Sequence, residues 1–394
     1  MPDLPDRYRT DVAGNRPQPA FDPLGVRLGS FLARADGDID IGYNSNLYGR
    51  SSNRVADHYF KLRPYFRLGS NWGRDSVEAS ARAALTRFSK ESTQNSNEYW
   101  LHASGAKEIG DRFEVRPAVD YSREALGRGS PENTQTAGSP AFVRSLLTNV
   151  AATYDGGLFS AALLLAYRRQ RFEPLNIDGN LISQRLRDTD GIGGRATFIY
   201  KTGSAISGLA QVVADETHNP HPEFGRDRSA RGYGILAGVR IDPSGLIAGQ
   251  VAVGMRHRDF RATRTSSRGF TYDARLEWYP TELITVAVKA NQEYRNSGIL
   301  AANAVLVDKQ TLDVTYEMYR DLNFYLEANH EKSSYREVSA HTDTKGVSLR
   351  ATYTSRRALQ LSAFAAYQRT TTDRPLLATQ HHALRAGLSA RIRI

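Results

Sequence analysis

Apolar and polar residues alternate along most of the chain, in segments of roughly ten residues that are separated by turn-forming residues. The segment 112–123 shows the two sets clearly: Phe113, Val115, Val119 and Tyr121 oppose Arg112, Glu114, Arg116 and Asp120. Successive side chains of a β-strand point to opposite faces, so a period of two predicts strands with one apolar and one charged face. The same division recurs in 270–279, 322–331 and 384–394. The chain is therefore expected to be an all-β protein.

This pattern predicts about eighteen strands, with sixteen or twenty as the alternatives if one hairpin is merged or missed. The expected strand centres are 30–43, 57–70, 75–88, 97–109, 112–123, 142–154, 158–171, 185–200, 205–215, 229–241, 246–260, 268–279, 283–295, 307–319, 322–334, 344–353, 358–370 and 381–394.

Aromatic residues stand beside many of the short turns. Tyr154, Tyr200, Tyr279, Tyr319 and Tyr353 each end one segment, directly before a tight turn. Aromatic rings settle at the membrane–water interface, and the short turns of a membrane barrel lie just beyond it. Longer polar links alternate with the short turns, at 44–56, 124–141, 172–184, 216–228, 296–306 and 371–380. The pattern predicts a transmembrane up-and-down antiparallel β-barrel with both termini in the periplasm.

One barrel domain accounts for nearly the whole chain. Residues 1–26 are polar and proline-rich and lack periodicity, which is typical of a flexible tail. Alternation begins near Arg27 and runs to Ile394 without a linker. We therefore expect a flexible periplasmic N-terminal tail at 1–26 and a barrel at 27–394. The first residues lack the basic and apolar regions of a signal peptide, so the printed sequence is expected to be a mature or engineered form, or one whose start is placed too late.

Composition excludes a membrane protein built from helices. The chain has 394 residues, of which 40% are hydrophobic, and a mean hydropathy of −0.50. Its longest apolar run, 158–167, is about half the roughly 20 residues of a spanning helix. A barrel needs apolar residues only at every second position, so this composition suits one. The absence of cysteine removes disulfides and thiolate metal sites.

The net charge of +10 points to an anionic solute or surface. Basic chains often bind nucleic acid, but arginine is spread over almost every segment here and no basic block stands out. We expect no nucleic-acid partner. An arginine-lined pore, or a surface that faces outer-membrane lipid and lipopolysaccharide, explains the charge better.

Three stretches in the N-terminal third resemble a known family. Residues 21–31, FDPLGVRLGSF, are similar to its "DPLGIRxGxF" start. Residues 41–48, IGYNSNLY, resemble its "GYDSN" loop motif, with Asn44 where the family usually has Asp, and residues 62–74, LRPYFRLGSNWGR, resemble its "PxxxLxSxWxR" hairpin. The family is that of the putative outer-membrane β-barrel porins, which are often associated with exopolysaccharide or capsule export. The resemblance implies a Gram-negative outer-membrane channel with polysaccharide as its cargo.

Candidate catalytic and metal-binding groups are weak. His218, His221 and Glu223 could form a ligand set, but prolines hold this loop extended, and adjacent His381 and His382 point to opposite faces. His257 and Asp259 share a face and could pair, whereas His330 is expected to point toward lipid near the outer rim. No serine nucleophile, phosphate loop, zinc spacing or dinucleotide motif is present. We expect no enzyme, no metal and no cofactor.

The charged faces of the predicted strands supply the candidate site. We expect them to line the lumen, where rings of charge set selectivity. The pore-lining candidates are Lys61, Arg63, Tyr65, Arg67, Arg82, Arg112, Arg116, Asp120, Arg275, Lys289, Arg295, Arg350, Arg385, Arg391 and Arg393. Solvation of the lumen together with acidic partners such as Glu78, Glu114, Asp120 and Glu277 is the simpler explanation for any one of them.

The expected function is passage of polysaccharide through this lumen, with a periplasmic polysaccharide-export protein meeting the N-terminal tail. A general or anion-preferring diffusion porin is the alternative, with a small anionic solute and a constriction loop at 124–141, where Gly127, Gly129, Pro131 and Pro140 lie. A soluble β-rich binding protein is a third class, kept open by the missing signal peptide.

Overall fold

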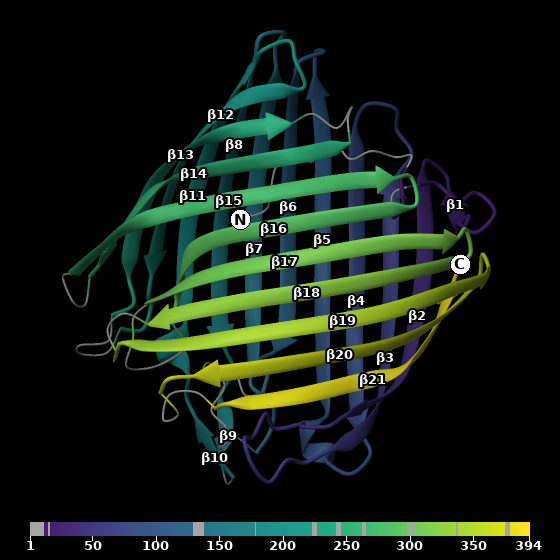
Figure 1. Ribbon diagram of the computed structural model, residues 1–394, viewed down its shortest axis with the longest axis vertical. Helices are drawn as coiled ribbons and strands as arrows, with labels where there is room; N and C mark the ends of the chain where they lie inside the picture. Colours follow the sequence, from purple (N-terminus) through teal and green to yellow (C-terminus); the bar gives the residue numbers. More distant parts are fainter. Residues whose placement is uncertain are drawn as a thin grey trace.

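The structure is a computed structural model, which describes residues 12–14, 16–128, 138–177, 179–222, 227–241, 246–261, 265–297, 302, 304–335, 338–374 and 379–394. Within these residues, eighteen long antiparallel strands close into one barrel. In Figure 1 the green and yellow strands cross in front of the purple and blue strands. The predicted barrel and its strand number are therefore confirmed.

The barrel strands are β2 (Phe31–Asn44), β3 (Asp57–Ser70), β4 (Ser76–Phe88), β5 (Ser96–Ile109), β6 (Phe113–Ala125), β7 (Phe142–Asp155), β8 (Phe159–Phe172), β11 (Thr189–Lys201), β12 (Ile206–His218), β13 (Ala230–Ile241), β14 (Ile247–Phe260), β15 (Thr265–Thr281), β16 (Ile284–Asn296), β17 (Ala304–Tyr319), β18 (Leu322–Tyr335), β19 (Ala340–Arg356), β20 (Leu359–Thr372) and β21 (His381–Arg393). The short elements are β1 (Val26–Leu28), the hairpin of β9 (Leu175–Ile177) and β10 (Asn180–Ile182), and the 3-10 turns η1 (Ser92–Gln94) and η2 (Arg185–Arg187).

Each barrel strand pairs with its neighbours in the chain, and β21 pairs with β2 to close the sheet. This closing seam joins nine residue pairs, from Asp36 with Arg393 to Asn44 with Arg385. The ladder between β2 and β3 joins fourteen pairs. The seam is therefore shorter than the ladder between β2 and β3.

The predicted strand positions agree with the structure to within a few residues, with one informative difference. The predicted strand 185–200 begins instead at Thr189, because η2 occupies residues 185–187. Arg187 is buried there and lies over the ring of Phe172, with 4.1 Å between the guanidinium carbon and the ring centroid. A tertiary contact thus overrides a residue pattern that would otherwise continue the strand.

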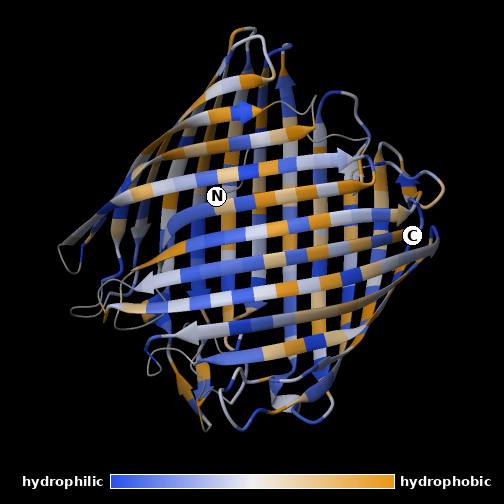
Figure 2. Cartoon of the chain, viewed as in Figure 1, coloured by the Kyte–Doolittle hydropathy of each residue, from blue (hydrophilic) through white to orange (hydrophobic). Residues whose placement is uncertain are grey.

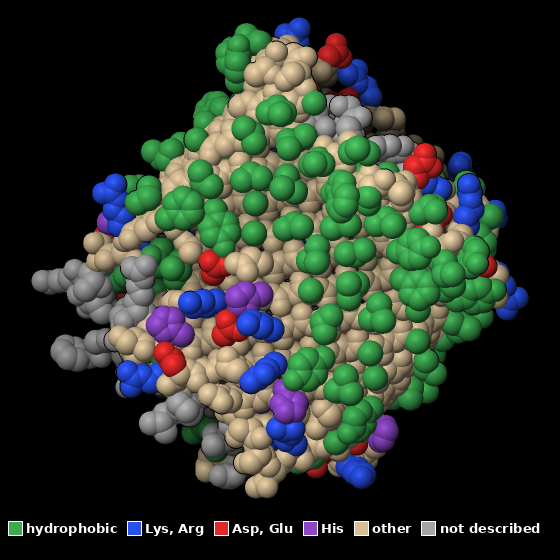
Figure 3. All heavy atoms as spheres, in the orientation of Figure 1, with side chains coloured by type: hydrophobic (Ala, Val, Ile, Leu, Met, Phe, Trp, Pro, Cys, Tyr) green, Lys and Arg blue, Asp and Glu red, His purple; other side chains and the backbone are tan. Residues whose placement is uncertain are grey.

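The outer face of the barrel is apolar. Figure 2 shows hydrophobic and hydrophilic residues alternating along the strands, and Figure 3 shows hydrophobic side chains covering much of the visible surface. Ile235 and Leu388 are 65% and 67% exposed. Few large apolar residues of a soluble protein are exposed to this extent. An apolar band around a closed sheet is what a bilayer requires of a barrel.

The two ends of the barrel differ. Short turns such as 156–158 and 320–321 join the strands at one end of the barrel, which we call the short-turn end. The first barrel strand, β2, begins at this end and the last, β21, finishes there. Longer connections such as 45–56 and 173–188 gather at the opposite, long-loop end. The expected turn at 242–245 lies outside the described residues. Among the described helices, none is long and apolar enough to cross a membrane.

Glycine permits close approach of the backbones of β13 and β14. A Cβ atom at Gly238 would collide with the backbone oxygen of Val251, and one at Gly254 with that of Ile235. Both glycines lie in the ladder between the two strands, where Gly238 pairs with Ala252 and Gly254 with Leu236. Any larger residue would push the strands apart, so these positions require glycine.

The N-terminal segment crosses the short-turn mouth instead of leaving it. Val12 is buried against Ala248 and Tyr279, and the Ala13 amide donates to the Glu282 carbonyl over 2.9 Å. Farther along, Arg357 donates to the carbonyl oxygens of Pro19 and Ala20, and Arg393 to that of Phe21. The segment 12–21, of which residue 15 is not described, therefore runs from the β14–β16 side of the mouth to the end of β21.

Candidate functional site

The inward face of the barrel carries the charged residues, as the alternation predicts. The ladder pairs Asp38 with Arg63 and Arg391, on the face opposite exposed Ile39 and Ile41. Arg63 bonds Asp40 at 2.8 Å and contacts Asp38 at 3.3 Å. This face is water-accessible lumen in a barrel whose outer surface is apolar.

Asp38 is the centre of the seam. Arg391 donates hydrogen bonds to both carboxylate oxygens of Asp38, from Nη2 to Oδ2 over 2.8 Å and from Nε to Oδ1. Asp38 and Asp40 are only 7% and 4% exposed, so their charges depend on these arginines. The bidentate pair joins β2 to β21 and thus holds the first and last strands together.

The register also places the other predicted residues of β3 and β4 on the inner face. Lys61 lies opposite Asp40, and Tyr65 lies between Asp36 and Arg82 in the ladders. Arg67 bonds Glu78 at 2.6 Å. Arg82 lies over the ring of Trp100 at 4.2 Å, a cation–π contact.

The candidates on β6 lie toward the short-turn end. Arg116 bonds Glu114 at 2.6 Å, and the Asp120 carboxylate accepts a hydrogen bond from His102 Nδ1 at 2.7 Å. Arg112 belongs to the turn before the strand. Arg112, Glu114 and Arg116 line a cavity of about 460 Å³ near this mouth.

The remaining candidates surround a large cavity of about 960 Å³ or flank the seam. Arg275, Lys289, Arg295 and Arg385 line this cavity. Lys289 bonds Asp313 at 3.2 Å and Arg295 bonds Glu293 at 2.5 Å. On the seam side, Arg350 lies over the Phe364 ring at 5.2 Å, while Arg391 and Arg393 contact Asp38 and the Phe21 carbonyl.

Hydroxyl and amide groups lie between the charges of the large cavity. They come from neighbouring strands β16 to β20: Asn291, Thr311, Asn329, Ser333, Thr342, Thr344, Gln368 and Thr370. Such groups can both donate and accept hydrogen bonds, which suits a hydroxyl-rich solute.

The charges are unevenly distributed around the lumen. On the inward faces of β19, β21, β2, β3 and β4, basic residues outnumber acidic ones. The basic residues are Arg34, Lys61, Arg63, Arg67, Arg82, Arg350, Arg385, Arg391 and Arg393, and the acidic residues are Asp36, Asp38, Asp40 and Glu78. We call this the basic wall. Lys61, Arg82, Arg350 and Arg385 have no carboxylate ion pair among the residues that the structure describes. The wall formed by β14 to β18 carries both signs in similar numbers.

Sequence reasoning missed part of the charged lining. Asp215 on β12 binds both Arg256, at 2.6 Å, and Arg258 on β14. Arg195 lies 3.6 Å from Asp273. Each of these residues sits at an inward position of an alternating strand, so the period of two could have identified its face but not its partner.

Two loops help to line the large cavity at the long-loop end. Leu47 and Gly49 come from the loop 45–56, and Gly127 and Arg128 from the loop after β6. Tyr48 donates to Glu91 over 2.6 Å, and this hydrogen bond adds to burial in raising the pKa of Tyr48. Of the predicted constriction loop 124–141, the part that includes Gly129 and Pro131 lies outside the described residues.

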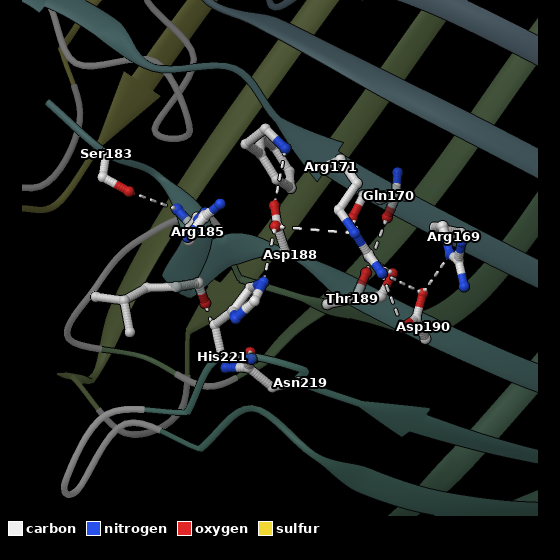
Figure 4. A network of polar contacts seen from close by, with 12 residues as sticks. Arg169, Gln170, Arg171, Ser183, Arg185, Asp188, Thr189, Asp190, Asn219 and His221 are labelled. Atoms are coloured by element: carbon white, nitrogen blue, oxygen red, sulfur yellow. Dashed lines mark hydrogen bonds and ion pairs between the residues drawn. The ribbon is translucent and has the colours of Figure 1, made fainter. Parts of the chain in front are cut away.

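The histidine candidates form pairs, not ligand sets. His257 and Asp259 pair as expected, at 2.8 Å, on the outer face. His330 also points outward, as predicted, and contacts Asp343 at 2.8 Å. His221 turns toward Asp188, 3.8 Å away, as Figure 4 shows, and Glu223 lies outside the described residues. The described part of the chain contains no group of three or more acidic, histidine or cysteine side chains placed to hold a metal.

A closed antiparallel barrel with an apolar exterior and a charged, water-accessible interior defines the class of β-barrel channels. The profile of one such family, described as "Putative beta-barrel porin 2", matches residues 18–392. The chain belongs to this family. No curated protein matches it significantly.

Three solved structures are similar to this chain at low sequence identity. The chain is similar to OccK2 (OpdF) of Pseudomonas aeruginosa, with 10% identity, a TM-score of 0.47, and coverage of 92% of this chain and 98% of that one. OccK1 (OpdK) of the same organism is similar with 11% identity, a TM-score of 0.46, and coverage of 92% of this chain and 99% of that one. The ferric enterobactin receptor mutant R480A of Pseudomonas aeruginosa (PfeA), in complex with enterobactin, is similar with 8% identity, a TM-score of 0.48, and coverage of 91% of this chain and 81% of that one.

Proposed function

We propose that this barrel lies in the bacterial outer membrane, long-loop end outward, and conducts an anionic polysaccharide through its lumen. The observation that carries the proposal is the basic wall. Its unpaired cations Lys61, Arg82, Arg350 and Arg385 add a net positive field that the paired residues do not. Low-dielectric walls focus such a field and concentrate anions in the lumen.

The lining of the large cavity favours a sugar over a simple ion. Hydroxyl and amide side chains such as Thr311, Asn329 and Gln368 can exchange hydrogen bonds with successive sugar hydroxyls. A chain that moves past many weak, similar contacts is not held at any one of them, which is what conduction requires. The N-terminal segment at the short-turn mouth would then be the place where a periplasmic export protein meets the barrel.

Ion selectivity in planar bilayers tests the charged lumen. Replacing Lys61, Arg82 and Arg385 together by Gln removes three positive charges, and we expect the reversal potential to move toward cation preference. Glu114→Gln with Arg116→Gln is the matched control, because it removes one ion pair and leaves the net charge unchanged. A reversal potential that is the same in the triple variant and in the wild type would place these cations away from the path.

Export in cells separates the two transport functions. The triple Gln variant should secrete less acidic polysaccharide while its barrel remains assembled. Altered ion selectivity with normal polysaccharide output would favour the anion-preferring diffusion porin. That alternative draws on the same basic wall, but it needs no contact with a sugar chain.

A further inference from the structure

A row of basic side chains crosses the outer face near the long-loop end. The ladders place His330 opposite Lys345, Lys345 opposite Arg369, and Arg369 opposite His382. All four point outward, on the same face as the exposed Leu326, Val347 and Leu384. We call these four residues the outer basic row. In Figure 3 basic and histidine side chains, with some acidic ones among them, lie beside the apolar ones over β18 to β21.

The row lacks the counter-charge that it needs. Like charges directly opposite each other on neighbouring strands are destabilising, and Lys345 and Arg369 form such a pair. Asp343 is the nearest carboxylate, 3.8 Å from Lys345, and it already binds His330 at 2.8 Å. Arg369 has no acidic partner among the described residues, and the Lys345 side chain is 69% exposed.

One further cation, Arg54, adds to the positive charge of this region. Arg54, from the loop 45–56, donates to His382 Nε2 over 2.7 Å. Lys332 is exposed but lies between Asp308 and Asp343 in the ladders, so its charge is matched there. The two ring nitrogens of His330 contact Gln310 Oε1 at 3.0 Å and Asp343 Oδ2 at 2.8 Å.

The depth of the row fits a lipid headgroup. On β19 the outward residues next to Lys345 toward the short-turn end are Val347 and Leu349, both exposed and apolar. On β20 the corresponding neighbour of Arg369 is Tyr367, whose ring packs against His382 with centroids 6.0 Å apart. Tyrosine marks the membrane interface, so the row lies one step beyond the hydrocarbon, where phosphate groups lie.

We propose that the outer basic row binds the phosphate groups of a phosphorylated glycolipid in the outer leaflet. The proposal rests on the membrane orientation given under the proposed function. Arg369 offers a planar fork for two phosphate oxygens, and Lys345 adds a point charge beside it. One phosphate between the two would replace their mutual repulsion with two charge-assisted hydrogen bonds.

A second outward group of arginines shows what a self-neutralised cluster looks like. Arg171 bonds both oxygens of Asp190 at 2.9 Å, and Arg169 bonds the same carboxylate at 3.1 Å (Figure 4). This cluster on β8 and β11 thus carries its own acceptor. It serves as an internal comparison, because its position on the outer face is similar and its two arginines are matched by Asp190 and by Asp188, which lies 3.9 Å from Arg171.

Binding of defined glycolipids to the detergent-solubilised full chain tests the proposal. Native mass spectrometry would compare diphosphorylated lipid A, the same lipid without phosphates, and inorganic phosphate. We expect binding only of the phosphorylated lipid, and a loss of at least tenfold in the double variant Lys345→Gln with Arg369→Gln. The charge-retaining exchange Lys345→Arg with Arg369→Lys should keep most of the affinity, and Arg169→Gln should leave it unchanged.

Each result decides one part of the inference. Equal binding of the dephosphorylated lipid, or unchanged affinity in the double variant, would overturn the phosphate contact. Binding of inorganic phosphate at the same affinity would show a simple anion site and overturn the lipid. Because the row lies outside the lumen, the double variant should keep the wild-type reversal potential, so failure here is distinct from failure of the transport proposal. Heat-modifiable migration in gels confirms that each variant is folded.

Discussion

The carboxylate of Asp38 should stabilise the closed barrel more than an ordinary ion pair does. It accepts two hydrogen bonds from Arg391 across the seam between β2 and β21, and it contacts Arg63 at 3.3 Å. The seam ladder joins only nine residue pairs, so fewer backbone hydrogen bonds hold β2 to β21 than hold β2 to β3. The change Asp38→Asn keeps the shape of the side chain and removes its charge.

The magnitude follows from burial. Removing one partner of a fully buried ion pair costs roughly 3–5 kcal/mol, whereas an exposed pair contributes about 0–1 kcal/mol. Asp38 is 7% exposed, but the Arg391 side chain is 46% exposed to lumen water and can recover part of its hydration. We therefore expect Asp38→Asn to lower the free energy of unfolding by about 2–3 kcal/mol.

Urea unfolding in lipid vesicles, followed by tryptophan fluorescence and by gel migration, measures this cost. Asp313→Asn is the control: its partner Lys289 is 50% exposed at a distance of 3.2 Å, and we expect a cost below about 1 kcal/mol. The double variant Asp38→Asn with Arg391→Gln should show a coupling of about 1 kcal/mol or more. Equal costs for Asp38→Asn and Asp313→Asn, or no coupling, would refute the role assigned to the seam.

Further predictions concern the outer face, the mouth and the loops. Leu163→Arg faces lipid and should cost about 2–4 kcal/mol of barrel stability, whereas Ala162→Arg faces the lumen and should cost far less; equal costs in urea titrations would mean that the faces are misassigned. Removing residues 1–17 should raise single-channel conductance, because Val12 and Ala13 would leave the short-turn mouth, and an unchanged conductance would show that this segment leaves the path open. Hydrogen bonds from Arg123 and Arg144 lower the pKa of Glu173. The stabilisation of the loop by this carboxylate is therefore fully present above its unfolded pKa of about 4.3, and it is lost as pH falls through the lower pKa of the folded state. Amide exchange near residues 173–177 should accelerate in that acidic range in the wild type, and should be fast and insensitive to pH in Glu173→Gln after correction for intrinsic exchange. Exchange that depends equally on pH in both would point to another group.

The sequence by itself determined the local geometry of the barrel. Alternation assigns a face to every strand residue, because side chains of an extended backbone point to opposite sides regardless of what lies nearby. The strand count, the short turns and the inward placement of Arg63, Arg116 and Lys289 follow from that local rule. The tight turns were equally readable, since glycine, aspartate and proline act through their own backbone dihedrals.

Only the tertiary structure decided which residues meet. Asp38 and Arg391 are 353 positions apart, and their contact exists because the last strand closes on the first. The basic wall depends on that same closure, since only the seam between β21 and β2 joins β19, β20 and β21 to β2, β3 and β4. The course of residues 12–21 across the mouth, and the row from His330 to His382, likewise join parts of the chain whose spacing in sequence gives no hint of contact. Periodicity is a property of one strand, whereas register and closure are properties of all of them together.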